Sequence, residues 1–281
     1  MHSSGGAREL TLDDFRVFQG FLSDSCGIVL DEGKQYLIKN RLGSLLRESG
    51  YGSLGELARA LKERTLPLAM RARIVDVMTT HETSWFRDPS QFDELRRSVF
   101  PELASARAGG IRIWSAACSS GQEPYSLSIC AEEWFRTAGK PGKMVQIVGT
   151  DVSEAVLEEG RKAVYSDLAL GRGLDENLRN RYFQSCHGGL RLLDSIATRV
   201  RFQQFNLLKP FSVLGKFDLI FCRNVLIYFS DDIKRDIVSR FAKSLNPGGY
   251  LFLSSTEALP SGAEGFDAVR GQAARYYRVK S

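Results

Sequence analysis

Short apolar stretches alternate with helix-like stretches over the second part of the chain, and this pattern constrains the fold more than any other. Strands that alternate with helices are typical of a parallel sheet covered by helices. We therefore predict a Rossmann-like, doubly wound α/β sheet over residues 109–281, with "FDAVRGQAARYYRVK" adding one or two antiparallel edge strands. The apolar stretches are "IRIWSAA", "VQIVGTD", "VRFQQFNLL", "FDLIFCRN" and "GYLFLSS".

The earlier part of the chain has a helical pattern instead. Thr11 followed by Asp14 predicts a capping box at the start of a helix, and Ser53 with Glu56 predicts a second one. We expect a small all-α domain that precedes the sheet and covers residues 8–88.

Two further boundaries follow from changes in the pattern. Residues 89–108 are predicted to link the helical domain to the sheet. The alternation is interrupted again at about residues 165–200, where we expect an inserted small β-subdomain.

The composition is that of an ordinary soluble globular protein, with 43% apolar and 25% charged residues among 281. The apolar runs are too short to cross a membrane, and Met1–Ala7 lacks the apolar core of a signal peptide, so we expect a disordered tail and a cytoplasmic protein. Five scattered cysteines and three dispersed histidines predict neither a disulfide framework nor a metal site. The net charge of +5 does not require nucleic acid as a partner and would suit an acidic one.

The turn after the first predicted strand, "SAACSSGQE", indicates the kind of ligand. It has one glycine, Gly121, and no lysine, so it lacks the signatures of a dinucleotide or phosphate loop. Its small side chains and the acid Glu123 suit a compact ligand with an ammonium group. Asp151, which ends the second strand, could bind the hydroxyls of a ribose or could simply cap the following helix. S-adenosylmethionine, an adenosine joined to an amino acid, fits both acids.

Several motifs in fixed order resemble the CheR family, the chemotaxis protein methyltransferases, over nearly the whole chain. The resemblance implies that a methyl group passes from S-adenosylmethionine to glutamate side chains in the cytoplasmic helices of chemoreceptors. We expect no metal, no nucleic-acid partner and no membrane insertion. The motifs are "TTHETSWFRDPSQF", "SAACSSGQEPYS", "GTDVS", "FNLL", "FDLIFCRNVLIYF" and "LNPGGYLFL".

The resemblance also implies site residues. Tyr228 matches a tyrosine that the family places near the transferred methyl group, and Arg87 is expected close by, so both are predicted to be catalytic. His81 stands where the family often has asparagine. The cofactor-binding residues carried over from the family are His81, Thr83, Arg87, Glu123, Asp151, Asn206, Leu207, Arg223 and Asn224.

Each of these residues has a simpler structural interpretation. Tyr228 could be a core aromatic residue, and Arg223 could form a salt bridge at the end of the sheet. Cys222 suggests a covalent nucleophile, but a small buried thiol is commoner.

Four basic residues around the second predicted helix suggest a partner surface. They are either part of a solvated face or a docking surface for an acidic helix, such as the coiled-coil receptor segments that the resemblance implies. The residues are Lys34, Lys39, Arg41 and Arg47.

The inserted segment raises a further question about partners. In some members of the family, a β-subdomain at this place captures a carboxy-terminal receptor peptide by strand addition. Because "QSCHGGLRLL" looks shorter here, we expect little or no dependence on such a peptide. Two other functions stay open: methylation of a nucleic acid or small molecule, and a non-catalytic receptor adaptor that binds the methyl donor.

Overall fold

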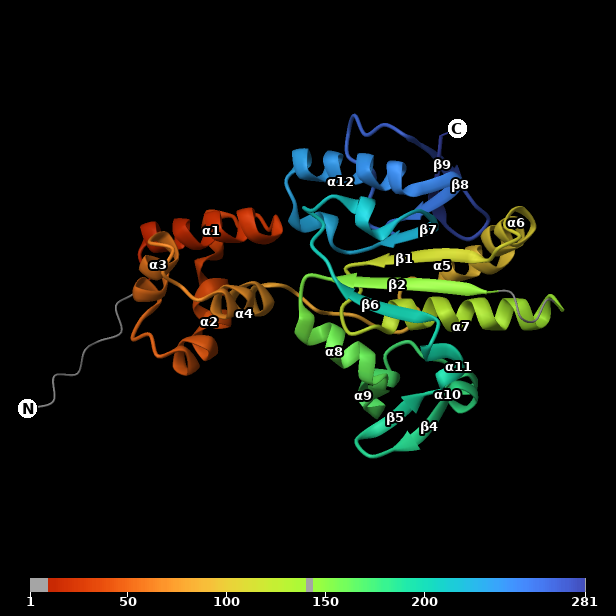
Figure 1. The fold of residues 1–281 in the computed structure, drawn as a ribbon, viewed down its shortest axis with the longest axis horizontal. Coiled ribbons are helices and arrows are strands. Elements are labelled where there is room, and N and C mark those ends of the chain that lie inside the picture. Colours follow the sequence, from red (N-terminus) through yellow and green to blue (C-terminus); the bar gives the residue numbers. More distant parts are fainter. Residues whose placement is uncertain (1–9, 140–143, 281) are drawn as a thin grey trace, which may run out of the picture. The chain divides into compact units, whose positions relative to one another are not determined.

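The computed structural model describes residues 10–139 and 144–280, so the predicted tail Met1–Ala7 lies outside the described residues. The chain forms two compact units (Figure 1). Of the described residues, one unit contains 10–80 together with Tyr228–Ser230, and the other contains 81–139, 144–227 and 231–280. Across the two described ranges, we find no helix that is both long and apolar enough to span a membrane.

The first unit is helical, as predicted. Thr11 and Asp14 form the predicted capping box, in which the Thr11 Oγ1 accepts a hydrogen bond from the Asp14 N–H at 3.1 Å. At the third helix, Ser53 caps the Glu56 N–H, but the Glu56 carboxylate accepts from Gly52 instead of closing the box. The elements are α1 (Leu12–Cys26), the 3₁₀ turn η1 (Glu32–Lys34), α2 (Gln35–Ser49), α3 (Leu54–Lys62) and α4 (Leu68–Met78).

The second unit is built on a seven-stranded sheet with the order β6-β2-β1-β7-β8-β10-β9. The first five of these strands run parallel, and β10 is antiparallel to both β8 and β9. This order confirms the doubly wound prediction. The strands are β1 (Ile111–Ala116), β2 (Val145–Asp151), β6 (Val200–Gln204), β7 (Phe217–Cys222), β8 (Leu245–Phe252), β9 (Phe266–Arg270) and β10 (Arg275–Val279).

Helices cover both faces of this sheet, because successive side chains of a buried strand point to opposite faces. Ile113 of β1 belongs to a buried cluster with residues of α7, whereas Trp114 packs against Phe211 and Phe241 on the side of α12 (Figure 1). The covering elements are α7 (Gln122–Thr137), α8 (Glu154–Lys162), η3 (Phe211–Leu214) and α12 (Asp231–Ser244), and the short turn η4 (Leu226–Tyr228) precedes α12 in the chain.

Residues 89–106 differ from the predicted linker, because they are helical and belong to the core of the second unit. Phe92, Leu95, Val99 and Leu103 are each at most 1% exposed. Their helical spacing is the signal that could have predicted these helices. The elements are α5 (Pro89–Glu94), a π-helical turn η2 (Leu95–Val99) and α6 (Phe100–Ala106).

The inserted subdomain, residues 164–197, contains a three-stranded sheet with the order β3-β5-β4, as predicted. It packs around Trp85, whose ring meets those of Tyr165 and Phe183 edge-on at 5.0 and 5.3 Å. The elements are β3 (Val164–Tyr165), α9 (Asp167–Leu170), α10 (Glu176–Tyr182), β4 (Phe183–Cys186), β5 (Gly189–Leu192) and α11 (Asp194–Ala197).

Candidate active site

The carboxyl ends of the parallel strands bring together most of the predicted site residues. β1 lies between β2 and β7, and the chain winds in opposite directions on either side of it. Ligands of open α/β sheets bind beyond the strand ends at such a switch point. The predicted residues that end or follow β1, β2, β6 and β7 here are Glu123, Asp151, Asn206, Leu207, Arg223 and Asn224.

The loop between β1 and α7 is held in an unusual backbone conformation. Ala117 and Ser119 have left-handed backbones with φ of 59° and 51°, which costs roughly 1–2 kcal/mol for each residue with a side chain. The Ser119 N–H donates to the Asp151 Oδ2 at 2.9 Å and so ties this loop to the end of β2. Gly121 has φ of 93°, and a Cβ there would lie 2.9 Å from the Phe202 ring. The loop therefore has a defined shape with its backbone groups at the strand ends.

Asp151 is buried at the end of β2 and accepts one backbone hydrogen bond on each oxygen. Ser119 donates to Oδ2 at 2.9 Å, and Ser153 donates to Oδ1 at 3.0 Å. Burial raises the pKa of Asp151, against the opposing effect of these N–H groups. Asp151 is only partly a helix cap, because the N-cap of α8 is Ser153, whose side chain accepts a hydrogen bond from the Val156 N–H. Because each carboxylate oxygen can accept more than one hydrogen bond, Asp151 can still accept from ligand hydroxyls.

Glu123 and Arg223 form a buried ion pair that extends to Asp88. The Arg223 Nη1 lies 3.1 Å from the Glu123 Oε2, and the Arg223 Nη2 lies 2.8 Å from the Asp88 Oδ2. The Arg223 Nη2 also donates to the Arg87 carbonyl at 2.6 Å. Burial raises the pKa of Glu123, although Arg223 and a hydrogen bond from Ser115 oppose the shift. The salt-bridge interpretation of Arg223 is thus correct, and this bridge organises the site edge.

The segment 81–88 lies against the same strand ends. The His81 carbonyl accepts a hydrogen bond from the Ser119 Oγ at 2.8 Å, and the Phe86 N–H donates to the Ser126 Oγ at 3.0 Å. These contacts fix the backbone of a segment that also carries Thr83 and Arg87, both of which are half-buried.

The Arg87 side chain lies near the acids of the site. Its Nη1 lies 3.4 Å from the Glu82 carbonyl oxygen, and its positive charge is one of the influences that lower the pKa of Glu123. The role of Arg87 beside the transferred methyl group stays a prediction from the family resemblance.

The ends of β6 and β7 supply the remaining predicted residues. The Asn206 Oδ1 accepts from the Leu208 N–H at 2.9 Å, and Leu207 is 7% exposed. Asn224 has a left-handed backbone with φ of 56°, and its N–H donates to the Glu257 Oε2 at 2.7 Å. Sequence reasoning missed Glu257, although an acid shortly after the apolar stretch "GYLFLSS" is a visible signal.

Comparisons with known proteins identify the family. The model described as "CheR methyltransferase, SAM binding domain" matches residues 81–275, and "CheR methyltransferase, all-alpha domain" matches residues 13–79. The chain belongs to the CheR methyltransferase family. It is 46% identical to chemotaxis protein methyltransferase 1 of Pseudomonas aeruginosa over 95% of this chain and 98% of that protein. It is 44% identical to chemotaxis protein methyltransferase Cher2 of Pseudomonas putida, over 95% and 98%.

This member of the CheR family is therefore an S-adenosylmethionine-dependent methyltransferase, and its strand-end residues fit that cofactor. The acids Asp151 and Glu123 lie at neighbouring strand ends, and only small side chains separate them in the turn 116–120. The two carboxylates therefore offer hydrogen-bond acceptors to a ribose and to the amino-acid part of the cofactor.

Cys222 ends β7, and Tyr228 follows it six residues later in the chain. Tyr228 ends the short turn η4, is half-buried and belongs to the first unit by its contacts. Cys222 is completely buried, and burial raises its pKa well above the usual range of a thiol. A protonated, buried thiol is a poor nucleophile, so the structure disfavours covalent catalysis by Cys222.

The predicted basic surface of this CheR family member is not uniform. Lys34 pairs with Asp31 at 3.1 Å, and Lys39 and Arg47 are exposed. Arg41 instead donates to the carbonyls of Met78 and Thr79 at 2.6 and 3.1 Å, so its guanidinium stabilises the end of α4.

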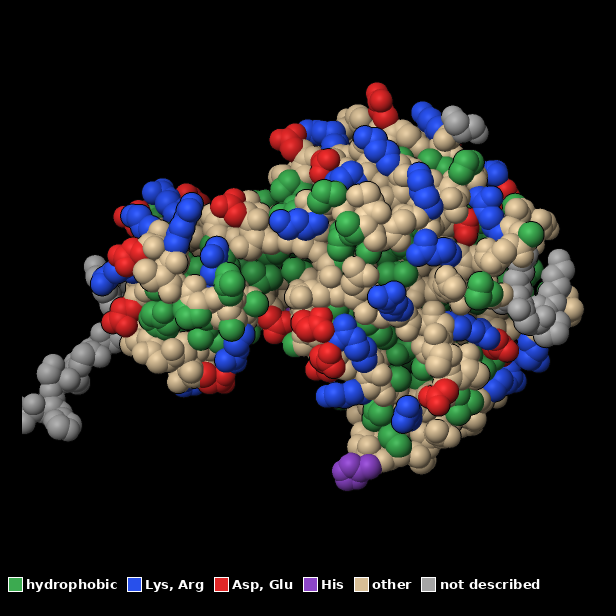
Figure 2. All heavy atoms as spheres, in the orientation of Figure 1, with side chains coloured by type: hydrophobic (Ala, Val, Ile, Leu, Met, Phe, Trp, Pro, Cys, Tyr) green, Lys and Arg blue, Asp and Glu red, His purple; other side chains and the backbone are tan. Residues whose placement is uncertain are grey.

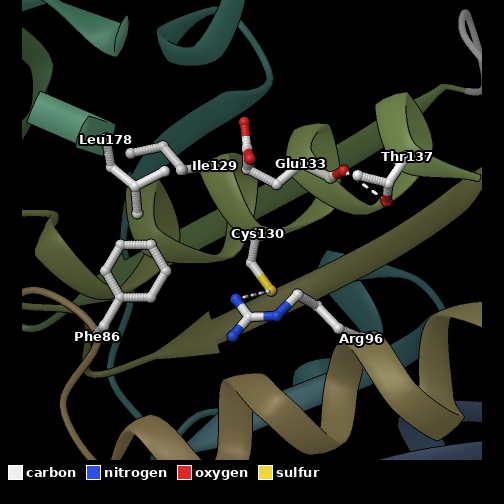
Figure 3. A pocket seen from close by; sticks show the side chains of 7 residues that line it. All are labelled: Phe86, Arg96, Ile129, Cys130, Glu133, Thr137 and Leu178. Atoms are coloured by element: carbon white, nitrogen blue, oxygen red, sulfur yellow. Dashed lines mark hydrogen bonds between the residues drawn. The ribbon is translucent and has the colours of Figure 1, made fainter. Parts of the chain in front are cut away.

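A cavity of about 190 Å³ lies beside α7, away from the strand ends (Figure 3). Its charged groups already have partners. Arg96 pairs with Asp93, and hydrogen bonds from Tyr182, Arg181 and Arg136 outweigh burial and lower the pKa of Glu133 to about 2. The cavity offers no uncompensated charge to a ligand. Its lining is Phe86, Arg96, Ile129, Cys130, Glu133, Thr137 and Leu178.

Proposed function

We propose that this protein methylates the side-chain carboxylates of specific glutamates in chemoreceptor cytoplasmic helices, in the cytoplasm, during adaptation in chemotaxis. The products would be a glutamate methyl ester and S-adenosylhomocysteine. The observation that carries this proposal is the match of both domains to chemotaxis protein methyltransferases over nearly their whole length. The buried acids and arginine at the strand ends support it.

The strand-end residues are proposed to hold the cofactor. When bound, S-adenosylmethionine supplies an electrophilic methyl group on a sulfonium. Asp151 would accept hydrogen bonds from the ribose hydroxyls, and Glu123 would face the amino-acid end while Arg223 balances its charge. The other proposed contacts come from His81, Thr83, Arg87, Asn206, Leu207 and Asn224.

The acceptor glutamate needs no general base. A glutamate carboxylate has an ordinary pKa of about 4.3 and is already an anionic nucleophile at neutral pH. Its oxygen forms the new bond to the methyl carbon, and the electrons of the broken carbon–sulfur bond stay on sulfur. The protein must therefore exclude water and align the reacting groups. Arg87 and Tyr228 are proposed to orient the carboxylate and the methyl donor.

The receptor is proposed to contact the basic residues of the helical unit. Lys34, Lys39 and Arg47 would attract acidic receptor helices, whereas Arg41 would act mainly by holding α2 to the end of α4. Figure 2 shows basic and acidic side chains interspersed on the viewed face. The attraction should therefore come from a local group of charges and should weaken as salt screens it.

A transfer assay tests the proposed substrate. The purified protein is incubated with tritiated S-adenosylmethionine and a receptor cytoplasmic fragment, and mild alkali then releases esterified methyl groups as volatile methanol. We expect base-labile label that disappears when the receptor glutamates are replaced by alanine. Label in RNA or a small molecule would support those substrates instead. Donor binding without transfer to several cognate receptors would indicate an adaptor.

The Arg87→Ala variant tests the proposed catalytic residue. We expect both the affinity for S-adenosylmethionine and the turnover to fall, because Arg87 is proposed to orient the methyl donor and the acceptor carboxylate. Arg97→Ala is a matched control, since Arg97 lies on η2 and is outside the proposed site. Wild-type rates and affinity in Arg87→Ala would remove Arg87 from the site.

The inserted subdomain is proposed to work without a tethering peptide. The β4–β5 hairpin is short, with His187 and Gly188 between its strands. We expect receptors with and without their carboxy-terminal peptide to be methylated at similar rates. A large loss of rate on removal of that peptide would contradict this proposal.

A further inference from the structure

Glu257 is a buried acid at the strand ends whose environment is unusual. It is 6% exposed and its Oε2 accepts two backbone hydrogen bonds, whereas its Oε1 has no hydrogen-bond partner among the described residues. Burying a carboxylate without full compensation costs stability. A stabilising role alone therefore does not explain an acid at this position.

The Glu257 carboxylate joins the ends of β7 and β8. Its Oε2 accepts from the Asn224 N–H at 2.7 Å and from the Ser254 N–H at 3.2 Å. Asn224 has φ of 56°, a conformation that residues other than glycine adopt at a cost. The short hydrogen bond to a charged acceptor offsets that cost and selects this backbone conformation.

The loop that contains Glu257 also contacts the arginine of the site. The Ser255 N–H lies 3.3 Å from the Asp88 Oδ2, which in turn pairs with Arg223. The loop after β8 thus supports both residues that follow β7: Arg223 through Asp88, and Asn224 through Glu257. Asp88 and Arg223 are 135 residues apart in the chain, and Asn224 and Glu257 are 33 apart. No local sequence pattern could therefore predict these contacts.

We propose that Glu257 is a positioning residue for the methyl donor, which acts by holding the Asn224 backbone in its left-handed conformation. The inference rests on the proposed assignment of Asn224 to the cofactor site. Glu257 touches no reacting group itself. By fixing that backbone, the Glu257 carboxylate determines where the Asn224 side chain lies at the end of β7.

The main test measures the affinity for S-adenosylhomocysteine by calorimetry and the steady-state kinetics of receptor methylation. Glu257→Ala removes the acceptor and should weaken binding by about ten- to hundredfold, the worth of one hydrogen bond to a charged group. The KM for S-adenosylmethionine should rise similarly, while the KM for the receptor should stay unchanged. Glu257→Gln keeps an acceptor oxygen but not the charge, so it should bind more weakly than the wild type by about three- to tenfold, less of a loss than in Glu257→Ala.

Two further variants separate positioning from simple destabilisation. Glu257→Asp keeps the charge but shortens the side chain, so it should weaken binding even if Glu257→Ala does not fold. Asp218→Asn alters another buried acid, 2% exposed, which accepts backbone and side-chain hydrogen bonds at the opposite end of β7. It should lower stability and leave both KM values unchanged.

A double-mutant cycle distinguishes the inference from the site assignment on which it rests. If Glu257 acts through Asn224, the double variant Glu257→Ala/Asn224→Ala should bind about as weakly as the weaker single variant. Normal binding by Glu257→Ala and Glu257→Asp, with weak binding by Asn224→Ala, would overturn the inference alone. Normal binding by Asn224→Ala would overturn the site assignment and the inference with it.

Discussion

Replacement of Arg223 by methionine should destabilise the second unit strongly, because it leaves two acids without their cation. The Arg223 side chain is 1% exposed and pairs with Glu123 at 3.1 Å and Asp88 at 2.8 Å, whose side chains are 13% and 25% exposed. Loss of one partner of a buried pair costs about 3–5 kcal/mol. Because Asp88 retains some contact with water, we expect a loss of about 3 kcal/mol in the free energy of unfolding.

The lysine variant is the matched control for this prediction. Arg223→Lys keeps the positive charge, but one ammonium group cannot reproduce the forked contacts to both carboxylates and the Arg87 carbonyl. We expect Arg223→Lys to lose about half as much free energy of unfolding as Arg223→Met. It should also bind S-adenosylhomocysteine about tenfold more weakly than the wild type, or roughly 1.4 kcal/mol.

Urea unfolding followed by tryptophan fluorescence measures this effect directly. The three tryptophans, Trp85, Trp114 and Trp134, all lie in the second unit, so their signal reports the unit that contains Arg223. Ordinary surface substitutions change the free energy of unfolding by at most about 0.5 kcal/mol. If the free energy of unfolding of Arg223→Met lies within that range of the wild-type value, the reasoning is refuted.

Three other substitutions test the framework around the site. Asp218→Asn should lower the free energy of unfolding by about 2–3 kcal/mol in urea, since Asp218 accepts hydrogen bonds from Arg107, Arg112 and Asn246; an unchanged midpoint would contradict this. Gly173→Ala should cost about 2–4 kcal/mol and weaken binding of S-adenosylhomocysteine, because its φ is 96° and a Cβ would lie 2.1 Å from the Trp85 carbonyl oxygen. Glu133→Gln should lose about 1 kcal/mol at pH 7. The pKa of Glu133 is lowered from 4.5 to about 2, so its stabilisation is present above pH 4.5 and is lost as the pH falls toward 2. The glutamine variant should show a flatter decline over that range, and equal slopes for both proteins would count against the assigned partners.

Much of the fold follows from patterns within the sequence. The helix Leu12–Cys26 begins where it was predicted because its signals are local: a capping box over Thr11 and Asp14, and apolar residues at helical spacing. The parallel strands were predicted for a similar reason, since each is a short apolar run followed by a helix. Residues 89–106 were predicted as a linker but are helical, because they lie between the helical domain and the first strand and pack their apolar positions into the core of the second unit.

The candidate site was predicted less completely. The positions after each strand could be predicted, because the carboxyl ends of parallel strands meet at one edge. The contacts among those positions could not. Arg41 illustrates the limit, since its charge predicted a partner surface whereas its guanidinium binds carbonyls at the end of α4. A charge pattern along one helix carries no information about what packs against it.

The sequence by itself determined the helices, the strands, the order of the two domains and the family, because these depend on residues that are close in the chain or on motifs in fixed order. Only the tertiary structure decided which polar groups pair with one another. Arg223 meets Asp88 across 135 residues, and Glu257 meets Asn224 across 33. Such pairs form because the sheet order brings the strand ends together, and neither residue carries a local signal for its partner.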